Sequence, residues 1–397
     1  MMSIKRSKPL LFVGGAYADI PLIKAAKTLG FHVSTTGLNQ NSPGHCEADE
    51  YYPVDYADHS AILDLAKRLK IEAICPGCND FCGLAATYVA EHLKLPGYDS
   101  FETAQIIHHK DAYRKFATAN NIPTPVAQCF TNSQEALAYL KLQKTPMIVK
   151  PVDLGSGSGI TKIEVNEDAG EKIATALTSS KAKRIVIEEF LEGTRHGLSC
   201  LLKNGKVVFS FFDDEHYFKN PYLVSGASSP SSVSEFAKKE LIEQSETIAE
   251  RLSLVDGLFH VQFIVRDDQP FIIEICRRPP GDWYPEFVKH ATSVDYPLQI
   301  VKSFTNPKSI ENSQTITTRF FLRHCIMSEQ DGQIAEIEYS ESILANVKDN
   351  YMVMKKGDQI ADHMTQRLGI VFIEFESAAE MQEKAPKMQE LIKVKVS

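Results

Sequence analysis

The first hundred residues alternate between short apolar runs and longer segments whose apolar positions recur at helical spacing. Residues 10–13 form an apolar run that ends at a glycine pair, and residues 20–29 then carry apolar side chains on one helical face. The alternation continues with strands expected at residues 31–35 and 71–75 and helices expected at residues 60–69 and 81–93. Strands that alternate with helices predict a parallel sheet flanked by helices over residues 1–105.

The pattern changes after residue 106. Helices are expected at residues 111–120 and 133–142, followed by a strand at residues 147–150. Next come strands at residues 184–188, 197–202 and 207–212, a polar stretch over 213–234, a long helix to residue 252, and paired strands at 258–266 and 270–276. From residue 315 the pattern is that of a small α+β unit. A chain of 397 residues is long enough for about two to three domains.

The composition excludes several classes of protein. A net charge of -8 and the lack of a lysine- and arginine-rich run argue against nucleic acid as a partner. Charged residues make up 24% and apolar residues 43%, as in soluble proteins with no membrane segment. The basic start precedes an apolar run over residues 9–13 that is too short for an export signal. We therefore expect a cytoplasmic protein.

The cysteines and the first glycine pair suggest two other sites, and neither pattern is complete. Cys75 and Cys78 have the spacing of a zinc knuckle, but no second cysteine or histidine pair follows at the required distance. The eight cysteines are therefore read as reduced, structural thiols. Gly14 and Gly15 follow a strand, but the dinucleotide fingerprint G-x-G-x-x-G is incomplete. A tight backbone turn is favoured over nicotinamide binding.

Four motifs between residues 110 and 281 suggest a site for phosphate transfer. The first is Lys150 at a strand end, followed by a glycine- and serine-rich loop over residues 154–160. Backbone amides in such a loop can surround phosphate oxygens, and the lysine adds a positive charge. The loop lacks the order of a P-loop, and by itself it is equally consistent with a plain flexible loop.

The second motif is an apolar strand, residues 185–187, that ends at the carboxylates Glu188 and Glu189. Such a strand-to-turn segment can offer adenine a backbone acceptor, a backbone donor and apolar walls. Taken alone, the segment reads as an acidic hairpin end.

The third and fourth motifs lie in the paired strands and directly after them. Alternation places Gln262 with His260 on one face of the first strand, and Glu274 with Cys276 on one face of the second. Because Mg²⁺ takes one or two oxygen ligands from protein and the rest from phosphate and water, Glu274 is the leading candidate ligand, with Gln262 beside it. The next residues, 277–278, are arginines that can stabilise a moving phosphoryl group.

Taken together, these motifs resemble the ATP-grasp superfamily, and in particular the ligases similar to carbamoyl-phosphate synthetase. The resemblance rests on His109-Lys110-Asp111-Ala112-Tyr113, the turn Ile122 to Pro125, and the segment Glu274-Ile275-Cys276-Arg277-Arg278-Pro279. Shorter phrases at residues 14–30, 39–44, 48–51 and 93–97 fall where these ligases carry similar ones. The resemblance covers nearly the whole chain.

The resemblance implies a fold and a domain division. It implies an ATP-grasp fold that combines α/β and α+β architecture. A pre-ATP-grasp domain with a parallel sheet would occupy residues 1–105, and the ATP-grasp domain residues 106–310. Within the latter, a smaller lid-like subdomain would span about 112–186 and a larger one 187–310. A C-terminal α+β cap would span 311–397.

The resemblance also implies a role for individual residues. Arg278, rather than Arg277, matches the catalytic arginine, and Glu274 and Gln262 match metal-ligand positions. The residues expected to contact ATP are Lys110, Lys150, Ser156, Gly157, Ser158, Glu188, Glu189, Phe190, Leu191 and His196. The cofactors implied are ATP and Mg²⁺, which Mn²⁺ can replace, and a homodimer is implied as well.

Three positions depart from the family pattern. Gln262 stands where an acidic metal ligand is more usual, although the carbamoyl-phosphate synthetases carry glutamine there. Cys276 replaces an asparagine, and a thiol is a poorer ligand for a hard cation. Arg195 stands where relatives often place a glutamate that binds ribose. These departures bear on whether one or two metal ions bind.

Among the subfamilies, residues 278–282 and 294–297 look most similar to L-amino-acid ligases and related carboxylate-amine ligases. This likeness implies an enzyme that activates a carboxylate as an acyl phosphate and passes it to an amine, with release of ADP and phosphate. The partners would be small molecules, including amino acids. Two alternatives remain: a synthetase similar to those of purine synthesis that activates formate or bicarbonate, and a nucleotide-binding regulatory protein without turnover.

Residues of the substrate end are expected in the polar stretch and beyond it. His216 is a candidate base toward the amine, although a lone histidine is more often a packing residue. Trp283, with Tyr284, could wall a side-chain pocket, although ordinary packing is the commoner explanation for such residues. Arg323 is a candidate clamp for a substrate carboxylate.

Overall fold

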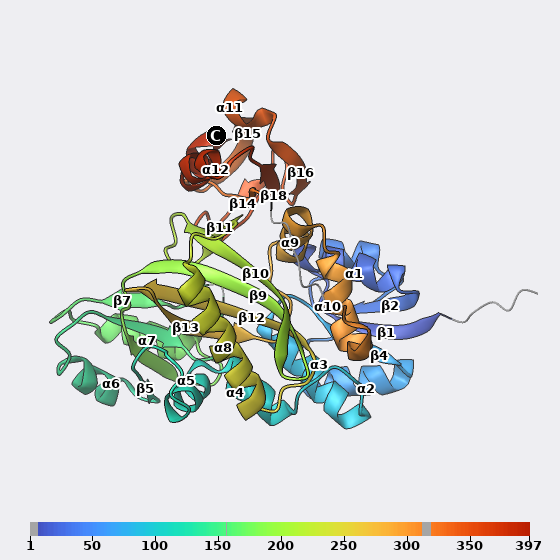
Figure 1. Ribbon diagram of the computed structural model, residues 1–397, viewed down its shortest axis with the longest axis horizontal. Coiled ribbons are helices and arrows are strands. Elements are labelled where there is room, and N and C mark those ends of the chain that lie inside the picture. Colours follow the sequence, from blue (N-terminus) through green and yellow to red (C-terminus); the bar gives the residue numbers. More distant parts are fainter. Residues whose placement is uncertain (1–6, 156, 312–318) are drawn as a thin grey trace, which may run out of the picture.

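The computed structural model describes residues 7–155, 157–311 and 319–397 (Figure 1). The predicted N-terminal parallel sheet is confirmed, with strand order β3-β2-β1-β4. Its strands are β1 (Lys8–Val13), β2 (Phe31–Thr36), β3 (Glu50–Tyr52) and β4 (Ala73–Pro76), and its helices are α1 (Ile20–Thr28), α2 (His59–Leu69) and α3 (Asp80–Leu93). Parallel pairing requires a crossover connection, and a helix supplies each of the long ones.

A small antiparallel sheet follows, in the order β5-β8-β6-β7. Its strands are β5 (Ala127–Phe130), β6 (Met147–Pro151), β7 (Thr161–Ile163) and β8 (Ile185–Glu189), and its helices are α6 (Ser133–Leu140) and α7 (Gly170–Ser179). One apolar cluster, which includes Phe130, Val149 and Ile187, joins this sheet to the two helices. The sheet therefore has a hydrophobic core of its own and lies at the end of the molecule opposite the parallel sheet (Figure 1).

The largest sheet has eight strands in the order β13-β12-β9-β10-β11-β14-β18-β16. Five strands come from the middle of the chain: β9 (Thr194–Lys203), β10 (Lys206–Tyr217), β11 (Val224–Ser229), β12 (Gly257–Arg266) and β13 (Gln269–Cys276). Three come from its end: β14 (Phe321–Ile326), β16 (Val347–Met352) and β18 (Gly369–Glu374). The helices α4 (Phe101–His108), α5 (Lys110–Ala119), α8 (Glu235–Arg251), α9 (Tyr284–Thr292) and α10 (Tyr296–Thr305) complete this part of the chain.

The end of the chain contributes to two sheets. Its strands β14, β16 and β18 extend the large sheet, while β15 (Gly332–Tyr339), β17 (Gln359–Ile360) and β19 (Ile392–Val396) form a separate small one with α11 (Glu341–Leu344), α12 (Ala378–Lys384) and α13 (Met388–Leu391) nearby. The predicted domain boundaries at residues 105 and 310 are not tested by this arrangement and stay predictions. No helix in the described ranges is long and apolar enough to cross a membrane.

The structure differs from the sequence pattern over residues 213–234, which were expected as a polar stretch and instead contain strand residues. Strand β10 continues to Tyr217, and residues 224–229 form β11, which pairs with both β10 and β14. Polar residues occupy these strands because the side chains at 213, 215 and 217 face a cavity rather than a core. Hydrophobic alternation therefore cannot reveal this part of the sheet.

One apolar core joins the N-terminal sheet, the large sheet and the helices α9 and α10. It contains Leu10 and Phe12 of β1, Phe211 of β10 and Phe287 of α9. The ring of Phe287 is fully buried and meets the ring of Phe211 edge-on at 5.2 Å. Burying aromatic rings across segments this distant in sequence fixes the relative position of the two sheets.

We expect Phe287→Ala to lower the free energy of unfolding by about 3–5 kcal/mol, because the cavity left by the ring cannot be filled by its packed neighbours. Urea denaturation followed by circular dichroism measures the change. The control is Phe236→Ala, whose ring is half exposed on α8, and for which a loss below about 0.5 kcal/mol is expected. Equal losses in the two variants would contradict the assignment of this core.

Candidate functional site

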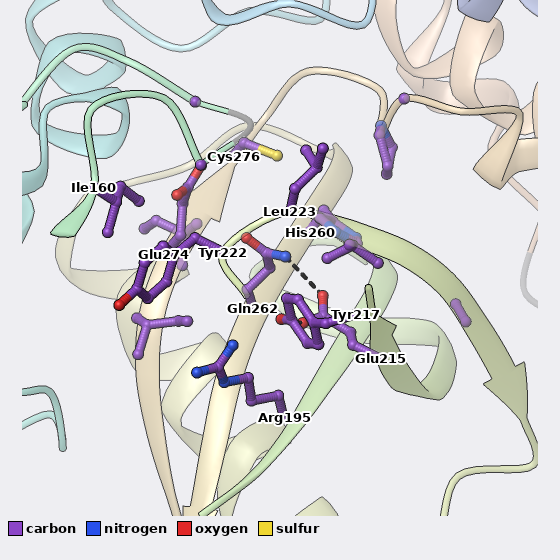
Figure 2. A pocket seen from close by; sticks show the side chains of 18 of the residues that line it. Ile160, Arg195, Glu215, Tyr217, Tyr222, Leu223, His260, Gln262, Glu274 and Cys276 are labelled. Carbon is purple, nitrogen blue, oxygen red and sulfur yellow. Dashed lines mark hydrogen bonds between the residues drawn. The ribbon is translucent and has the colours of Figure 1, made fainter. Parts of the chain in front are cut away.

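A cavity of about 380 Å³ lies where the small antiparallel sheet, the large sheet and the first turn of the parallel sheet meet. Figure 2 shows side chains from β9, β10, β12 and β13 pointing into it, among them Arg195, Glu215, Gln262 and Glu274. Its lining has two ends of different character. One end carries lysines and the apolar strand residues, and the other carries arginines and buried carboxylates.

Lys150 and Glu188 form a buried ion pair at the first end. The Lys150 Nζ lies 2.7 Å from the Glu188 Oε2, and the Arg114 Nε lies 3.0 Å from the Glu188 Oε1. Burial alone would raise the pKa of Glu188, but the charges of Arg114 and Lys150 outweigh it and lower the pKa. The strand pairing of β6 with β8 places these side chains on one face, so Lys150 is held in a fixed position.

Lys110 is held at the start of α5 in a similar way. Its Nζ donates to the Leu154 carbonyl at 2.8 Å and lies 3.5 Å from the Glu274 Oε2. Lys110 is only 7% exposed, and both it and Lys150 line the cavity. The structure therefore brings together the two lysines and the glutamate that the sequence singled out.

The glycine loop closes one side of this end. Gly155 and Gly157 line the cavity, and a Cβ at Gly157 would lie 2.8 Å from the Tyr222 carbonyl oxygen. Gly157 also has a φ of +72°, a conformation that favours glycine. Ser158 does not line the cavity, and Ser156 lies outside the described residues.

The predicted adenine segment lies at the same end. Glu189, Phe190 and Leu191 line the cavity together with three isoleucines from facing strands, Ile148, Ile264 and Ile273. Flat apolar walls with a strand edge between them suit a planar heterocycle. The side chain of Glu188, by contrast, is committed to the lysine and arginine described above.

The two strands β12 and β13 pair as expected, with Gln262 beside Glu274. His260 lies opposite Cys276. The Gln262 Nε2 donates to the Glu215 Oε1 at 2.6 Å, and the Tyr217 hydroxyl donates to the Glu215 Oε2 (Figure 2). Burial raises the pKa of Glu215. Glu215 lies in the polar stretch where residues of the substrate end were expected, but no individual role was predicted for it; its signal is its alternation with Asp213 and Tyr217.

The donor set fits a hard cation that takes few ligands from protein. The side chain of Glu274 is 27% exposed, and Lys110 is the cation beside it. No group of three or more His, Cys, Asp or Glu residues suited to a metal occurs in the described part of the chain. Burial raises the pKa of Cys276 to about 12, so its thiol stays protonated and does not suit Mg²⁺. Glu274, with the Gln262 amide oxygen nearby, fits a magnesium ion that shares phosphate ligands.

Arg278 is held by the parallel sheet rather than by its own strand. Its Nε lies 2.8 Å from the Oδ1 of Asp80, at the start of α3, and His108 Nδ1 lies 3.2 Å from the same oxygen. Burial alone would raise the pKa of Asp80, but the charge of Arg278 holds the pKa well below its usual range. Arg278 therefore reaches the cavity as a fixed, permanently charged group.

The arginine-rich end contains residues from both ends of the chain. Arg323 and Arg367 line the cavity, and both lie near Asp282, at 3.9 and 2.8 Å. The Tyr17 hydroxyl also donates to Asp282. Arg323 was predicted at this site, whereas Tyr17 and Arg367 were missed because nothing local in the sequence marks them.

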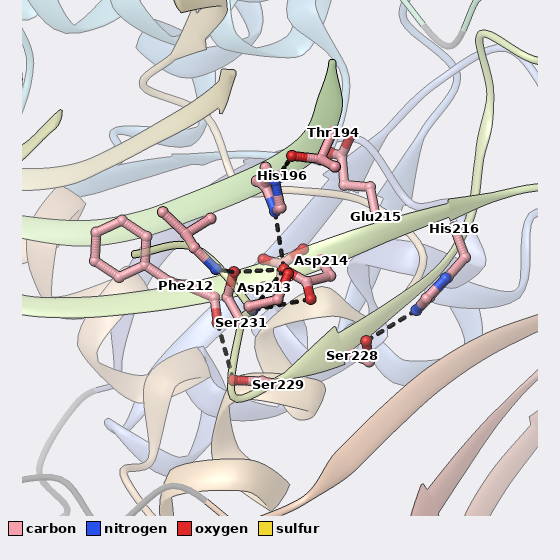
Figure 3. Close-up of polar contacts among 12 residues, drawn as sticks. Thr194, His196, Phe212, Asp213, Asp214, Glu215, His216, Ser228, Ser229 and Ser231 are labelled. Carbon is pink, nitrogen blue, oxygen red and sulfur yellow. Dashed lines mark hydrogen bonds and ion pairs between the residues drawn. The ribbon is translucent and has the colours of Figure 1, made fainter. Parts of the chain in front are cut away.

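Three candidates lie outside the cavity lining. His196 is buried, and its ring nitrogens contact Asp214 at 2.8 Å and Thr194 at 2.6 Å (Figure 3). The His216 Nε2 lies 2.8 Å from the Ser228 hydroxyl, and burial lowers the pKa of His216 to about 4. The Trp283 ring stacks on Tyr351 at 4.5 Å and donates to a backbone carbonyl. Each ring is already occupied by neighbours within the fold.

Comparison with known proteins gives a family for the centre of the chain. Residues 109–282 match the model of an ATP-grasp domain. The phosphoribosylamine–glycine ligase of Brucella melitensis is 24% identical over 256 residues, which is 60% of this chain and 59% of that protein. The same ligase of Streptococcus suis is 31% identical over 159 residues, or 38% of each protein. The chain thus spans less than two thirds of the length of these curated relatives.

The similarity of fold extends over nearly the whole chain. The L-amino acid ligase from Bacillus licheniformis superimposes with a TM-score of 0.83, covering 99% of this chain and 100% of that one at 19% identity. An identity this low shows a shared fold and no more. The centre of the chain thus matches an ATP-grasp domain, and the chain as a whole shares its fold with an L-amino acid ligase.

Proposed function

We propose that the chain is an ATP-dependent carboxylate-amine ligase, which activates a carboxylate as an acyl phosphate and passes the acyl group to an amine. One observation carries this proposal. A single cavity is lined by two fixed lysines, a half-buried glutamate and a fixed arginine. These are the charges that a phosphoryl group needs as it moves from ATP to a carboxylate.

In this mechanism each side chain has one task. Residues 189–191 and the isoleucine walls hold the adenine, while Lys150 and Lys110 contact the phosphates. An oxygen of the substrate carboxylate attacks the γ-phosphorus, and the bond between that phosphorus and the oxygen of ADP breaks. Arg278 stabilises the negative charge on the phosphoryl group as it is transferred. Because these groups are already fixed by ion pairs, little reorganisation is needed during the reaction.

Glu274 and Gln262 would hold the magnesium ion, which when bound neutralises charge on the phosphate oxygens. The glycine loop over residues 154–160 would close over the nucleotide and exclude water, since an acyl phosphate is readily hydrolysed. The likeness to L-amino acid ligase and to phosphoribosylamine–glycine ligase supports substrates that contain a carboxylate and an amine.

The direct test is phosphate release from ATP and magnesium with a panel of amino acids, singly and in pairs. Release that requires two substrates and is absent from a Glu274→Ala, Arg278→Ala double variant supports the ligase. Phosphoribosylamine with glycine belongs in the panel, because both curated relatives are named for that pair. ATP binding without release under any condition would favour a regulatory protein, a reading to which the protonated thiol of Cys276 lends some weight.

We expect Lys150→Met to weaken ATP binding by about 10- to 100-fold, because a charge-assisted contact to phosphate is worth about 1.5–3 kcal/mol. Isothermal titration calorimetry with ATP and magnesium measures the affinity. Lys115→Met, at an exposed position on α5, is the matched control and should bind as the wild type does. An unchanged affinity in folded Lys150→Met would remove this lysine from the nucleotide site.

We expect Arg278→Lys to lower the turnover number by about 100- to 1000-fold with little change in ATP affinity, because lysine keeps the charge but loses the planar guanidinium. Hydroxylamine trapping of the acyl phosphate as a hydroxamate measures the loss. Arg251→Lys, at an exposed position on α8, serves as the control. A parallel loss of ATP affinity would instead make Arg278 a nucleotide-binding residue.

A further inference from the structure

A buried carboxylate at the polar end of the cavity has no role in the mechanism above. Asp213 lines the cavity and is 1% exposed. Its Oδ2 accepts a hydrogen bond from the Tyr284 hydroxyl, whereas its Oδ1 has no hydrogen-bond partner among the described residues. No described lysine, arginine or histidine forms an ion pair with it within 4 Å. A buried acidic side chain with no cationic partner is costly in its ionised form, so its retention on a cavity wall points to a cationic ligand.

The neighbouring strand makes room for this carboxylate. Gly197 of β9 pairs with Asp213, and a Cβ at Gly197 would lie 2.7 Å from the Asp213 Oδ2. Any other residue at 197 would push the carboxylate out of its position. The arrangement is therefore a built feature of the sheet rather than a loose surface acid.

The groups around Asp213 combine both signs of charge. Glu215 lies two residues further on the same face, and Arg323 lies two strands away in the same sheet, on β14, in register with Glu215 through Ala227 of β11. The Arg323 side chain is 3% exposed, and its Nε has no hydrogen-bond partner among the residues described. Asp214 points to the opposite face of β10, toward His196 and Ser231 (Figure 3).

We propose that Asp213 receives the ammonium group of the amine substrate and takes its proton before the amine attacks the acyl phosphate. This inference rests on the proposed ligase function and names its nucleophile as a primary amine that arrives protonated. The side chain of Asp213 is almost fully buried and lines the cavity. Its Oδ1, to which no described residue donates a hydrogen bond, offers the acceptor that an ammonium group needs.

The step balances in atoms and charge. One N–H bond of the ammonium breaks as the proton moves to the Asp213 carboxylate, which leaves a neutral amine with a free electron pair. That pair forms the C–N bond, the C–O bond to phosphate breaks, and phosphate leaves. The second proton lost by the nitrogen goes to the departing phosphate, so the product is a neutral amide.

The proton affinity of Asp213 suits this task. Burial and the charge of Glu215 raise its pKa to about 8, although Tyr284 and Arg323 act in the opposite direction and Asp214 adds to the rise. A general base is most effective when its pKa lies near the working pH. His260, which also lines this end, is a poor alternative because burial and the charges of Arg278 and Arg323 lower its pKa to about 3.

The other acids and bases nearby are already engaged. Both carboxylate oxygens of Glu215 accept hydrogen bonds, one from Gln262 and one from Tyr217. His216 contacts Ser228 on the far face of β10. Asp213 alone in this group combines a free oxygen with a position on the cavity wall.

The test compares two nucleophiles in wild type, Asp213→Asn and the control Asp214→Asn. With an amino-acid amine, Asp213→Asn should lose about 100-fold or more in kcat/KM, whereas hydroxylamine, which is uncharged at neutral pH, should still form hydroxamate within about threefold of wild type. Asp214→Asn changes the same residue type on the opposite face, where its charge is only a minor cause of the raised pKa of Asp213, and should change kcat/KM with either nucleophile by less than about threefold. An equal loss with both nucleophiles, or no loss with the amino acid, overturns the inference.

The two proposals fail in different ways. If wild type forms hydroxamate and Asp213→Asn uses the amino acid normally, only the role of Asp213 is wrong. If wild type forms no hydroxamate with any carboxylate in the panel, the ligase function fails and this inference fails with it.

The raised pKa of Asp213 can also be checked without an activity assay, by measuring the stability of the folded protein as a function of pH. A carboxyl whose folded pKa is raised contributes stability that is fully present below its unfolded pKa of about 3.9 and is lost as the pH rises through the folded value. With a folded pKa of about 8, wild type should lose stability relative to Asp213→Asn between pH 5 and pH 8 and no further above that range. A constant difference across this range would contradict the assigned proton affinity.

Discussion

The fully buried carboxylate of Glu188 is the constraint on which the nucleotide end of this molecule depends. A carboxylate removed from water is stable only if cations neutralise it, and Glu188 has two, Lys150 from β6 and Arg114 from α5. The requirement ties the small antiparallel sheet to the helix that begins at Lys110. The ion pairs offset the cost of burying Glu188. They also hold the ammonium group of Lys150 in a fixed position on the cavity wall.

The same principle recurs at longer range. Asp80 of the parallel sheet holds Arg278, and Asp99 holds Arg277, with 2.8 Å between the paired atoms in each case. Asp282 holds Arg367 from the end of the chain, also at 2.8 Å. Each pair joins segments far apart in sequence, and Arg278, Asp282 and Arg367 of these pairs line the cavity. The site is thus assembled by ion pairs between parts of the chain that the apolar core has already brought near.

The sequence was sufficient for the features that have a local signal. Alternation revealed the parallel sheet and the pairing of Gln262 with Glu274, and the motif around residues 274–279 led to the ATP-grasp family. It was insufficient where polar residues form strands. Asp213 and Glu215 sit in β10, but without apolar alternation they read as part of a loop. Tyr17 and Arg367 carry no local mark, because only tertiary contacts bring them to the cavity.

Residues from both ends of the chain contribute to the polar end of the cavity. The lysines, the glutamate and the adenine segment all lie within residues 109–282, whereas Tyr17, Arg323 and Arg367 lie outside that range. Under the proposed function, the side chains that contact the nucleotide all come from one continuous stretch of sequence, whereas the polar end of the cavity also draws on segments outside it. Under the proposed function, a substitution at one of these three outer positions would change the polar end of the cavity while leaving in place the lysines that contact phosphate.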